Sequence, residues 1–246
     1  MKHYFFIGFY LICSVIIYLF QGSVAVYIAA FLAFLFVIIW GASDVGLGYF
    51  VKSITHKKTK KKEVALTFDD GPTEFTPLFL DILKKNQVKA TFFCIGKQIE
   101  KHPDIFKRII EEGHSIGNHT YSHSNKTGLL STSEMVKEIS RCDDAIQHFG
   151  NISTPFYRPP FGVTNPNISR AISKTKKISV GWNIRSFDTK INDYQKIVKK
   201  IDRQLKPGSI ILLHDTSQKS LQVLADLLLI LQRKDYSTFT VEEIKK

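Results

Sequence analysis

Hydrophobic and polar positions divide the chain into two regions with different patterns. Residues 4–20 and 24–40 form two runs that are rich in Phe, Ile and Leu and contain no charged side chain. Each run would be about 25 Å long as a helix, which is near the ~30 Å thickness of a bilayer's hydrocarbon core. Residues 21–23 separate the runs with the sequence Gln-Gly-Ser, which is typical of a tight turn. The pattern predicts two N-terminal membrane spans joined as a helical hairpin.

A cleaved signal peptide is the alternative interpretation of the first run, with cleavage near residues 23–25. Cleavage there would leave the second run in place, and that run would still be a membrane span. Burial in a soluble core is disfavoured, because two adjacent long runs lack any charge. The expected location is therefore the cell membrane.

Beyond residue 62, short apolar runs alternate with segments of helical periodicity. Strands are expected at residues 64–68, 89–93, 114–118, 155–158, 177–183, 209–213 and 236–240. Helices are expected at residues 77–86, 97–112, 131–149, 192–205 and 217–233. Ser131 and Glu134 have the spacing of a capping box, and Pro207-Gly208 closes the element before a strand. This alternation predicts βαβ units and a parallel sheet, open or closed.

Charge and cysteine content add two points. Five lysines lie between Lys57 and Lys62 in a chain of net charge +12. Such a cluster favours anionic lipid headgroups and the cytoplasmic side of a membrane, although a solvated linker has the same composition. Nucleic acid is not an expected partner, because no aromatic residues interleave with the lysines and no recognition motif follows. The three cysteines match no zinc or redox spacing and imply no disulfide framework.

Candidate chemistry gathers where the expected strands end, which is where active sites of parallel α/β folds lie. Five of the seven expected strands are followed by such residues: Asp69 and Asp70; His119 and His123; Arg158; Trp182 and Asp188; His214 and Asp215. Two adjacent carboxylates repel each other and are costly to bury without a partner. A simple polar turn explains one aspartate better than two.

His119 and His123 are spaced to face the same way in a helical turn, so both imidazoles can bind one cation. Two imidazoles and one carboxylate make three protein ligands and leave positions open for water or substrate. One aspartate of the pair would then bind the metal, and its neighbour would stay free as a base. Two stray histidines on a surface helix are the alternative. His214 can carry a proton near neutral pH, and Arg158 can clamp a carboxylate.

These residues carry a resemblance. Thr67-Phe68-Asp69-Asp70-Gly71, His119-x-x-x-His123, Arg158-Pro159-Pro160-Phe161-Gly162 and Leu213-His214-Asp215 resemble successive motifs of the polysaccharide deacetylase (NodB-homology) family, or family 4 carbohydrate esterases. The resemblance covers about residues 63–240. It implies a deformed (β/α) barrel and a divalent-metal N- or O-deacetylase acting on sugars. The expected organisation is a membrane anchor (1–50), a basic linker (51–62) and a catalytic domain (63–246).

The resemblance also implies a role for each residue. Asp69 would be the general base and His214 the acid that protonates the leaving amine. Asp70, His119 and His123 would hold the metal, for which two imidazoles and one carboxylate suit Zn²⁺. The remaining roles would be a partner for Asp69 (Arg158), a partner for His214 (Asp188), an oxyanion-binding backbone N–H (Phe161) and walls of the acetyl pocket (Trp182, Ile211).

The chain departs from the family pattern at its fourth motif. The family sequence Asp-x-x-Asp-Trp is replaced by Arg185-Ser186-Phe187-Asp188-Thr189. The second aspartate is kept, so the resemblance still implies catalysis, but the substrate groove differs. Arg185 could point outward and line that groove, where it could bind an anionic substrate group, or inward toward His214. The outward orientation is favoured, because an unpaired inward cation beside a metal site would be costly.

Three functions remain open at this point. The leading one is removal of N-acetyl or O-acetyl groups from N-acetylglucosamine units of a cell-wall or surface polysaccharide. A second is deacylation of a lipid-linked sugar at the cytoplasmic membrane face. A third is a non-enzymatic carbohydrate-binding member of the fold. The family's action on polymers outside the cell favours the outer face, whereas the lysine cluster favours the cytoplasmic one. No feature indicates an oligomeric state.

Overall fold

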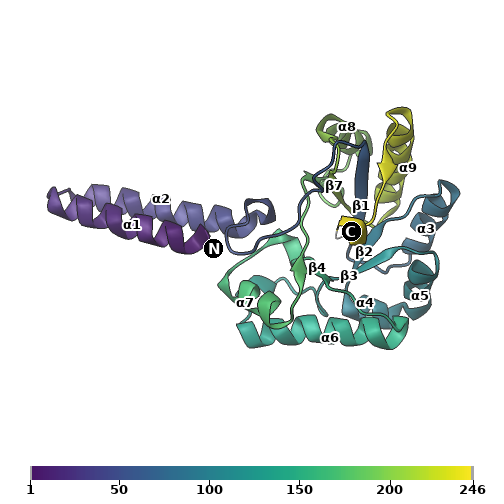
Figure 1. Ribbon diagram of the computed structural model, residues 1–246, viewed down its shortest axis with the longest axis horizontal. Helices are drawn as coiled ribbons and strands as arrows, with labels where there is room; N and C mark the ends of the chain where they lie inside the picture. The colour runs from purple at the N-terminus through teal and green to yellow at the C-terminus, as the bar shows by residue number, and fades with distance from the viewer. Residues whose placement is uncertain (1, 245–246) are drawn as a thin grey trace.

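The computed structural model describes residues 2–244. Its first two helices, α1 (Lys2–Leu19) and α2 (Val24–Ser43), pack side by side as a hairpin that projects from the rest of the molecule (Figure 1). They have 18 and 20 residues, and by length and composition both are apolar enough to cross a membrane. Most of their large apolar side chains are exposed, as expected for helices that face lipid.

The base of the hairpin is attached to the folded domain. Lys2 Nζ donates a hydrogen bond to the Leu47 carbonyl (2.7 Å), and the Thr164 N–H donates to the Ala42 carbonyl (2.8 Å). Gly41 is buried, and a Cβ there would collide with the Tyr49 ring. The start of α1 and the end of α2 therefore both lie at the domain, with the turn at the far end (Figure 1).

A single parallel sheet forms the centre of the domain. Its strands are β1 (Glu63–Asp69), β2 (Thr91–Cys94), β3 (Ser115–Asn118), β4 (Phe156–Tyr157), β5 (Ile178–Ser179), β6 (Ile184–Arg185), β7 (Ile210–His214) and β8 (Ser237–Thr238). Within residues 2–244 the order is β5-β4-β3-β2-β1-β7-β6, with β8 added beside the start of β1. All these pairs are parallel. The predicted deformed barrel of about seven strands is confirmed.

Helices cover the outside of this sheet (Figure 1). They are α3 (Thr76–Lys85), α4 (Gly96–Lys101), α5 (Pro103–Glu111), α6 (Thr132–Gly150), α7 (Pro166–Lys174), α8 (Tyr194–Gln204) and α9 (Gln218–Arg233), with the 3₁₀ turns η1 (Val45–Leu47), η2 (Thr127–Leu129), η3 (Pro160–Gly162) and η4 (Val241–Ile244). The predicted capping box of Ser131 and Glu134 opens α6. Three details differ from the prediction. The helix expected at 97–112 breaks before Pro103, the strand expected at 177–183 is much shorter, and α7 was not predicted.

The segment 51–62 contacts the barrel directly. Strands β5 and β6 do not pair, which leaves a gap in the barrel, and Ile54 and His56 enter it. Ile54 bridges to Val180 and His56 to Ser209. These bridges satisfy strand-edge N–H and C=O groups that would otherwise lack partners. At the far end, Lys57 pairs with Glu63 (3.1 Å).

Alternation along the strands separates two cores. Residues such as Leu66 and Phe68 pack outward against the covering helices, and Ala65 and Ile210 pack inside the barrel. A third cluster joins Tyr49 and other residues of the segment after α2 to α6 and α7. The ends of the parallel strands therefore meet at one edge, beside the segment that leaves the hairpin.

Candidate active site

Strand register brings the two ends of the predicted site together. Asp69 is the last residue of β1 and is aligned with His214, the last residue of β7. Asn118 ends β3 and is aligned with Tyr157 of β4, which places His119 and Arg158 next to each other. The Arg158 N–H donates to the Asn118 carbonyl (3.0 Å). Residues far apart in the sequence thus converge because their strands end at one edge.

Asp70, His119 and His123 converge on one point. Their ligand atoms lie within 4.8 Å of one another. Asp70 Oδ1 is 3.5 Å from His119 Nε2 and 3.4 Å from His123 Nε2. His119 Nδ1 is 2.8 Å from the Arg158 carbonyl oxygen, to which it donates. That bond leaves Nε2 with its lone pair directed at the cluster, as a metal-binding imidazole requires.

The cluster fits a divalent cation by its own chemistry. Asp70 Oδ1 is buried and has no hydrogen-bond partner among the described residues. A buried carboxylate oxygen without a partner is costly, and a cation bound between it and the two imidazoles would remove that cost. Burial raises the pKa of Asp70, but the neighbouring imidazoles, His119 foremost and then His123 and His214, lower it well below its usual range. Asp70 is therefore a carboxylate.

The two histidines do not lie on a helical turn as predicted. They belong to an irregular loop in which the Thr120 N–H donates to Asn118 Oδ1 (2.9 Å) and the His123 N–H to Thr120 Oγ1 (3.1 Å). Positive φ angles recur around this site, at Asp70 (75°), Thr120 (67°), His123 (47°), Phe161 (60°) and Phe187 (61°). Such backbone strain is common where side chains are held for function. The loop still brings both imidazoles to Asp70.

Asp69 forms a buried ion pair with Arg158. Arg158 Nη1 donates to Asp69 Oδ1 (2.7 Å) and to Thr67 Oγ1 (2.8 Å), and Nη2 donates to the Gly181 carbonyl (2.9 Å). The guanidinium also lies over the Phe93 ring at 4.0 Å. Arg158 is fully buried, so these contacts fix its position. Asp69 Oδ2 is the freer oxygen and lies 3.7 Å from His119 Nε2.

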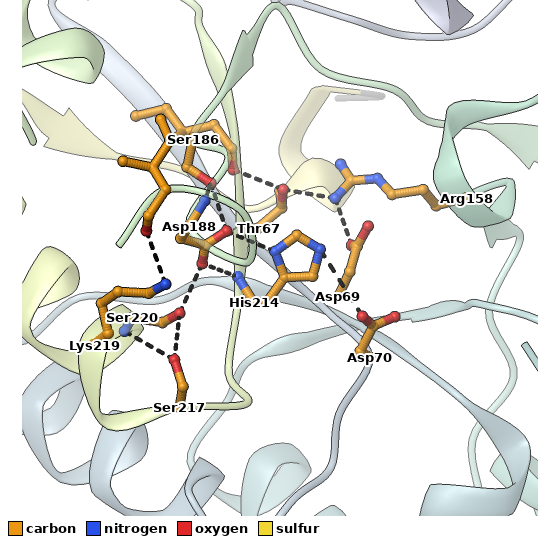
Figure 2. Close-up of polar contacts among 12 residues, drawn as sticks. Thr67, Asp69, Asp70, Arg158, Ser186, Asp188, His214, Ser217, Lys219 and Ser220 are labelled. Carbon is orange, nitrogen blue, oxygen red and sulfur yellow. Dashed lines mark hydrogen bonds and ion pairs between the residues drawn. The ribbon is translucent and has the colours of Figure 1, made fainter. Parts of the chain in front are cut away.

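His214 is held by Asp188 on the other side of the site (Figure 2). Nδ1 of His214 donates to Asp188 Oδ1 (2.7 Å), and the His214 backbone N–H donates to Oδ2 (2.9 Å). Ser186 and Ser220 hydroxyls also donate to Asp188. Nε2 of His214 therefore points toward Asp70, at 3.9 Å from its Oδ2. Burial lowers the pKa of His214, but the bond and charge of Asp188, with Asp69 and Asp70, raise it to about 9.

The assignment of Ile211 to the acetyl pocket is wrong. Ile211 packs in the outer core with residues of the covering helices. Alternation along β7 places Leu212, not Ile211, on the same strand face as His214. The motif spacing pointed to this strand, but only the register shows which residue faces the site.

The other expected pocket residues lie at the rim. The Phe161 ring packs 4.7 Å from His123 and is 44% exposed. Trp182 is half-buried, and Gly162 lets it pack closely, because a Cβ there would be 2.8 Å from its ring. Arg185 lies over the rings of Trp182 (5.5 Å) and Phe187 (4.9 Å).

Sequence reasoning gave no role to Asp215, which is fully buried beside the site. Its Oδ2 accepts from Thr76 Oγ1 (2.5 Å), and its carbonyl accepts from Thr73 Oγ1 (2.5 Å). Burial raises the pKa of Asp215 to about 7. These bonds tie the turn after Asp70 to the end of β7. The motif Leu213-His214-Asp215 includes this aspartate, but its hydrogen-bond partners Thr76 and Thr73 are 139 and 142 residues away in the sequence.

The site combines a His₂Asp cluster with an Asp–Arg pair and a His–Asp pair at one edge of a parallel α/β half-barrel. The sequence profile of the polysaccharide deacetylase family matches residues 56–178. The chain belongs to this family.

Individual relatives support the same assignment. A peptidoglycan-N-acetylglucosamine deacetylase of Bacillus cereus is 41% identical over 68% of this chain. The match covers 61% of that protein, so the chain spans about three fifths of this relative's length. The solved structure of a peptidoglycan N-acetylglucosamine deacetylase with a bound N-oxidanyl-benzamide superposes with a TM-score of 0.74 and 36% identity, over 78% of this chain and 92% of that one.

Membership of the fold does not by itself imply activity. A family pseudoenzyme from Bacillus anthracis also superposes, with a TM-score of 0.73 and 25% identity, over 79% of this chain and 69% of that one. Any functional conclusion must therefore rest on this chain's own site residues.

Proposed function

We propose that the chain is a metal-dependent hydrolase that removes N-acetyl groups from a carbohydrate. The observation that carries the proposal is the arrangement of two buried pairs on either side of the cation-binding cluster. Asp69 is paired with Arg158 on one side, and His214 is paired with Asp188 on the other. A base and an acid on opposite sides of one cation site are what hydrolysis of an amide requires.

Each side chain has a distinct task in this proposal. Asp70, His119 and His123 would hold the cation, which when bound lowers the pKa of water and polarises a carbonyl. Asp69 Oδ2 accepts the proton of the attacking water, because Arg158 occupies Oδ1. His214 Nε2 donates a proton to the leaving nitrogen. The backbone N–H of Phe161 is assigned to the oxyanion, and Trp182 and Leu212 to the walls of the acetyl pocket.

N-acetylglucosamine units of the cell wall are the proposed substrate class, by similarity to the Bacillus cereus relative. Removal of O-acetyl groups is the alternative reaction at the same site. Zn²⁺ is the proposed cation, because two imidazoles and one carboxylate are a ligand set that suits it. The site favours an enzyme over a carbohydrate-binding protein, because binding alone would need neither the Asp69–Arg158 pair nor the His214–Asp188 pair.

Acetate release separates these two classes. The full chain in detergent, stripped of metal and then supplied with Zn²⁺, is expected to release acetate from an N-acetylglucosamine oligosaccharide in proportion to bound metal. A protein that binds the oligosaccharide but releases no acetate at any metal loading would be a binding protein, and the proposal would fail.

Asp188→Asn is expected to lower kcat by up to about 10²-fold, at the lower end of general acid–base effects. His214 acts as an acid, so activity falls as pH rises through its pKa. Asp188 raises that pKa. Its neutral replacement leaves burial to lower the pKa, so the alkaline limb of the pH–kcat profile should move to lower pH.

The surface variant Asp202→Asn is the control for this experiment, because Asp202 pairs with Lys234 on the outside of the domain. Its pH profile should match that of the unsubstituted protein. An alkaline limb that stays in place in Asp188→Asn would show that Asp188 does not act through His214.

We further infer that residues 1–50 anchor the domain in the cell membrane. The two apolar helices support this, and so does the exposed lysine cluster at 58–62, which would lie near anionic headgroups. Both ends of the hairpin lie at the domain, so one measurement of the domain's side of the membrane also gives the side on which both helix ends lie. A C-terminal reporter active only in the periplasm or outside would place the domain there, and a reporter active only in the cytoplasm would place it inside.

A further inference from the structure

A second hollow lies beside the candidate active site, where the hairpin joins the barrel. It has a volume of about 520 Å³ and is lined by Asp44, Val45, Trp182, Arg185, Phe187 and Lys200, among others. Its walls come from four parts of the chain: the end of α2 with η1, Thr55 of the segment 51–62, the segment around β6, and α8. None of the roles assigned above uses this hollow as a whole.

Two cationic side chains in the hollow, Arg185 and Lys200, contact the same aromatic ring, that of Phe187. Lys200 Nζ lies 3.6 Å from the centroid of the Phe187 ring, and Arg185 Cζ lies 4.9 Å from it. Neither side chain forms an ion pair within residues 2–244, and burial together with Arg185 lowers the pKa of Lys200. Like charges held this close repel each other, and an anion between them would relieve that repulsion.

The one acidic residue that lines the hollow is occupied elsewhere. Asp44 is exposed, and its Oδ1 accepts from the Gly46 N–H (2.8 Å), so that it caps η1. The hollow therefore presents a guanidinium and an ammonium to whatever enters it. A guanidinium offers paired N–H donors that match phosphate oxygens, and an ammonium adds a point charge.

Trp182 connects this hollow to the active site. Arg158, the partner of Asp69, lies with its Cζ 5.5 Å from the Trp182 ring, and Arg185 Cζ lies at the same distance from that ring. A ligand that passes Trp182 would place its acetyl group beside the cation cluster and an anionic group in the hollow.

The hollow also lies where α2 ends. Ser43, the last residue of α2, lines it, and Val45 is buried against Gly181, where a Cβ would be 2.8 Å from Val45 Cγ1. If α2 spans a bilayer, this end lies at the depth of lipid phosphates. The position favours an anion that is attached to a lipid over one carried by a distant polymer.

We propose that Arg185 and Lys200 form a binding site for the phosphate of a lipid-linked acetylated saccharide. This inference rests on the proposed deacetylase function and specifies its substrate. The saccharide would extend from the phosphate past Trp182 to the cation cluster, while the lipid stays beside the hairpin.

The test compares three substrates with the full chain in detergent micelles. They are an N-acetylglucosamine-containing disaccharide, the same disaccharide as its diphosphate, and the diphosphate linked to a polyprenyl chain. Acetate release gives KM and kcat for each. We expect KM to fall from the first substrate to the last. Arg185→Ala and Lys200→Ala should each raise KM for the two phosphate-bearing substrates about tenfold more than for the neutral one, as loss of a charge-assisted hydrogen bond predicts.

Lys199→Ala is the matched control. Lys199 precedes Lys200 on α8 but is exposed and lines a different surface, so all three KM values should stay unchanged. Equal effects of Arg185→Ala on neutral and phosphate-bearing substrates would overturn the phosphate site. Equal KM values for the diphosphate with and without its polyprenyl chain would overturn the lipid-linked substrate. Failure of the unsubstituted protein to deacetylate any of the three substrates would instead refute the proposed function.

Discussion

His119→Ala is expected to remove both bound metal and turnover. His119 Nε2 is one of three ligand atoms that converge within 4.8 Å, and its orientation is fixed by the Arg158 carbonyl. Changes to residues that merely orient a ligand typically cost about 10–100-fold in metal affinity or activity, so loss of a ligand should exceed about 100-fold. Metal per chain, measured by atomic absorption after dialysis, should fall in parallel with acetate release.

His148→Ala provides the control, because His148 is exposed on α6. This variant should keep the metal content and the activity of the unsubstituted protein. Circular dichroism of His119→Ala shows whether the fold is intact, which matters because His119 is buried and donates to the Arg158 carbonyl. A folded His119→Ala protein with undiminished metal content would mean that the cation binds elsewhere.

Much of this site could be predicted because polar residues end apolar strands. Asp69, Arg158 and His214 each follow a run of apolar residues, and parallel strands place such ends at one edge of a sheet. The alternation of strands and helices predicted a parallel sheet, and the family resemblance implied that it forms a deformed barrel. Local patterns were sufficient to locate these residues, because the position where an apolar strand ends can be read from the sequence around it.

Features that depend on long-range packing were predicted less well. The spacing of His119 and His123 suggested a helical turn, but the loop is set by hydrogen bonds of Asn118 and Thr120. Ile211 was wrongly assigned to the pocket. The motif identified the correct strand, β7, but Ile211 lies on the outer face of that strand. The lysines of the segment 51–62 gave no indication that its apolar Ile54 bridges to the barrel, at a gap that exists because β5 and β6 stay apart.

Asp69→Asn and Asp70→Asn are expected to separate catalysis from metal binding. Asp69 is held by Arg158 at 2.7 Å, whereas Asp70 Oδ1 faces the two histidines and has no hydrogen-bond partner among the described residues. Asp69→Asn should therefore retain the metal and lose about 10²–10⁴-fold in kcat, the usual contribution of a general base. Asp70→Asn should lose the metal and, with it, the activity.

The pair is informative because the two residues are adjacent and the substitutions are identical. A general disturbance of the turn would affect both variants alike, in metal content and in activity. If Asp69→Asn instead loses the metal and Asp70→Asn retains it, the roles of the two carboxylates are reversed. Arg158 makes that reversal unfavourable, because a carboxylate oxygen already held by a buried guanidinium is less available to a second cation. In the proposed mechanism, adjacent carboxylates have different functions because of a single difference: Asp69 faces a buried cation of the protein, and Asp70 faces two imidazoles.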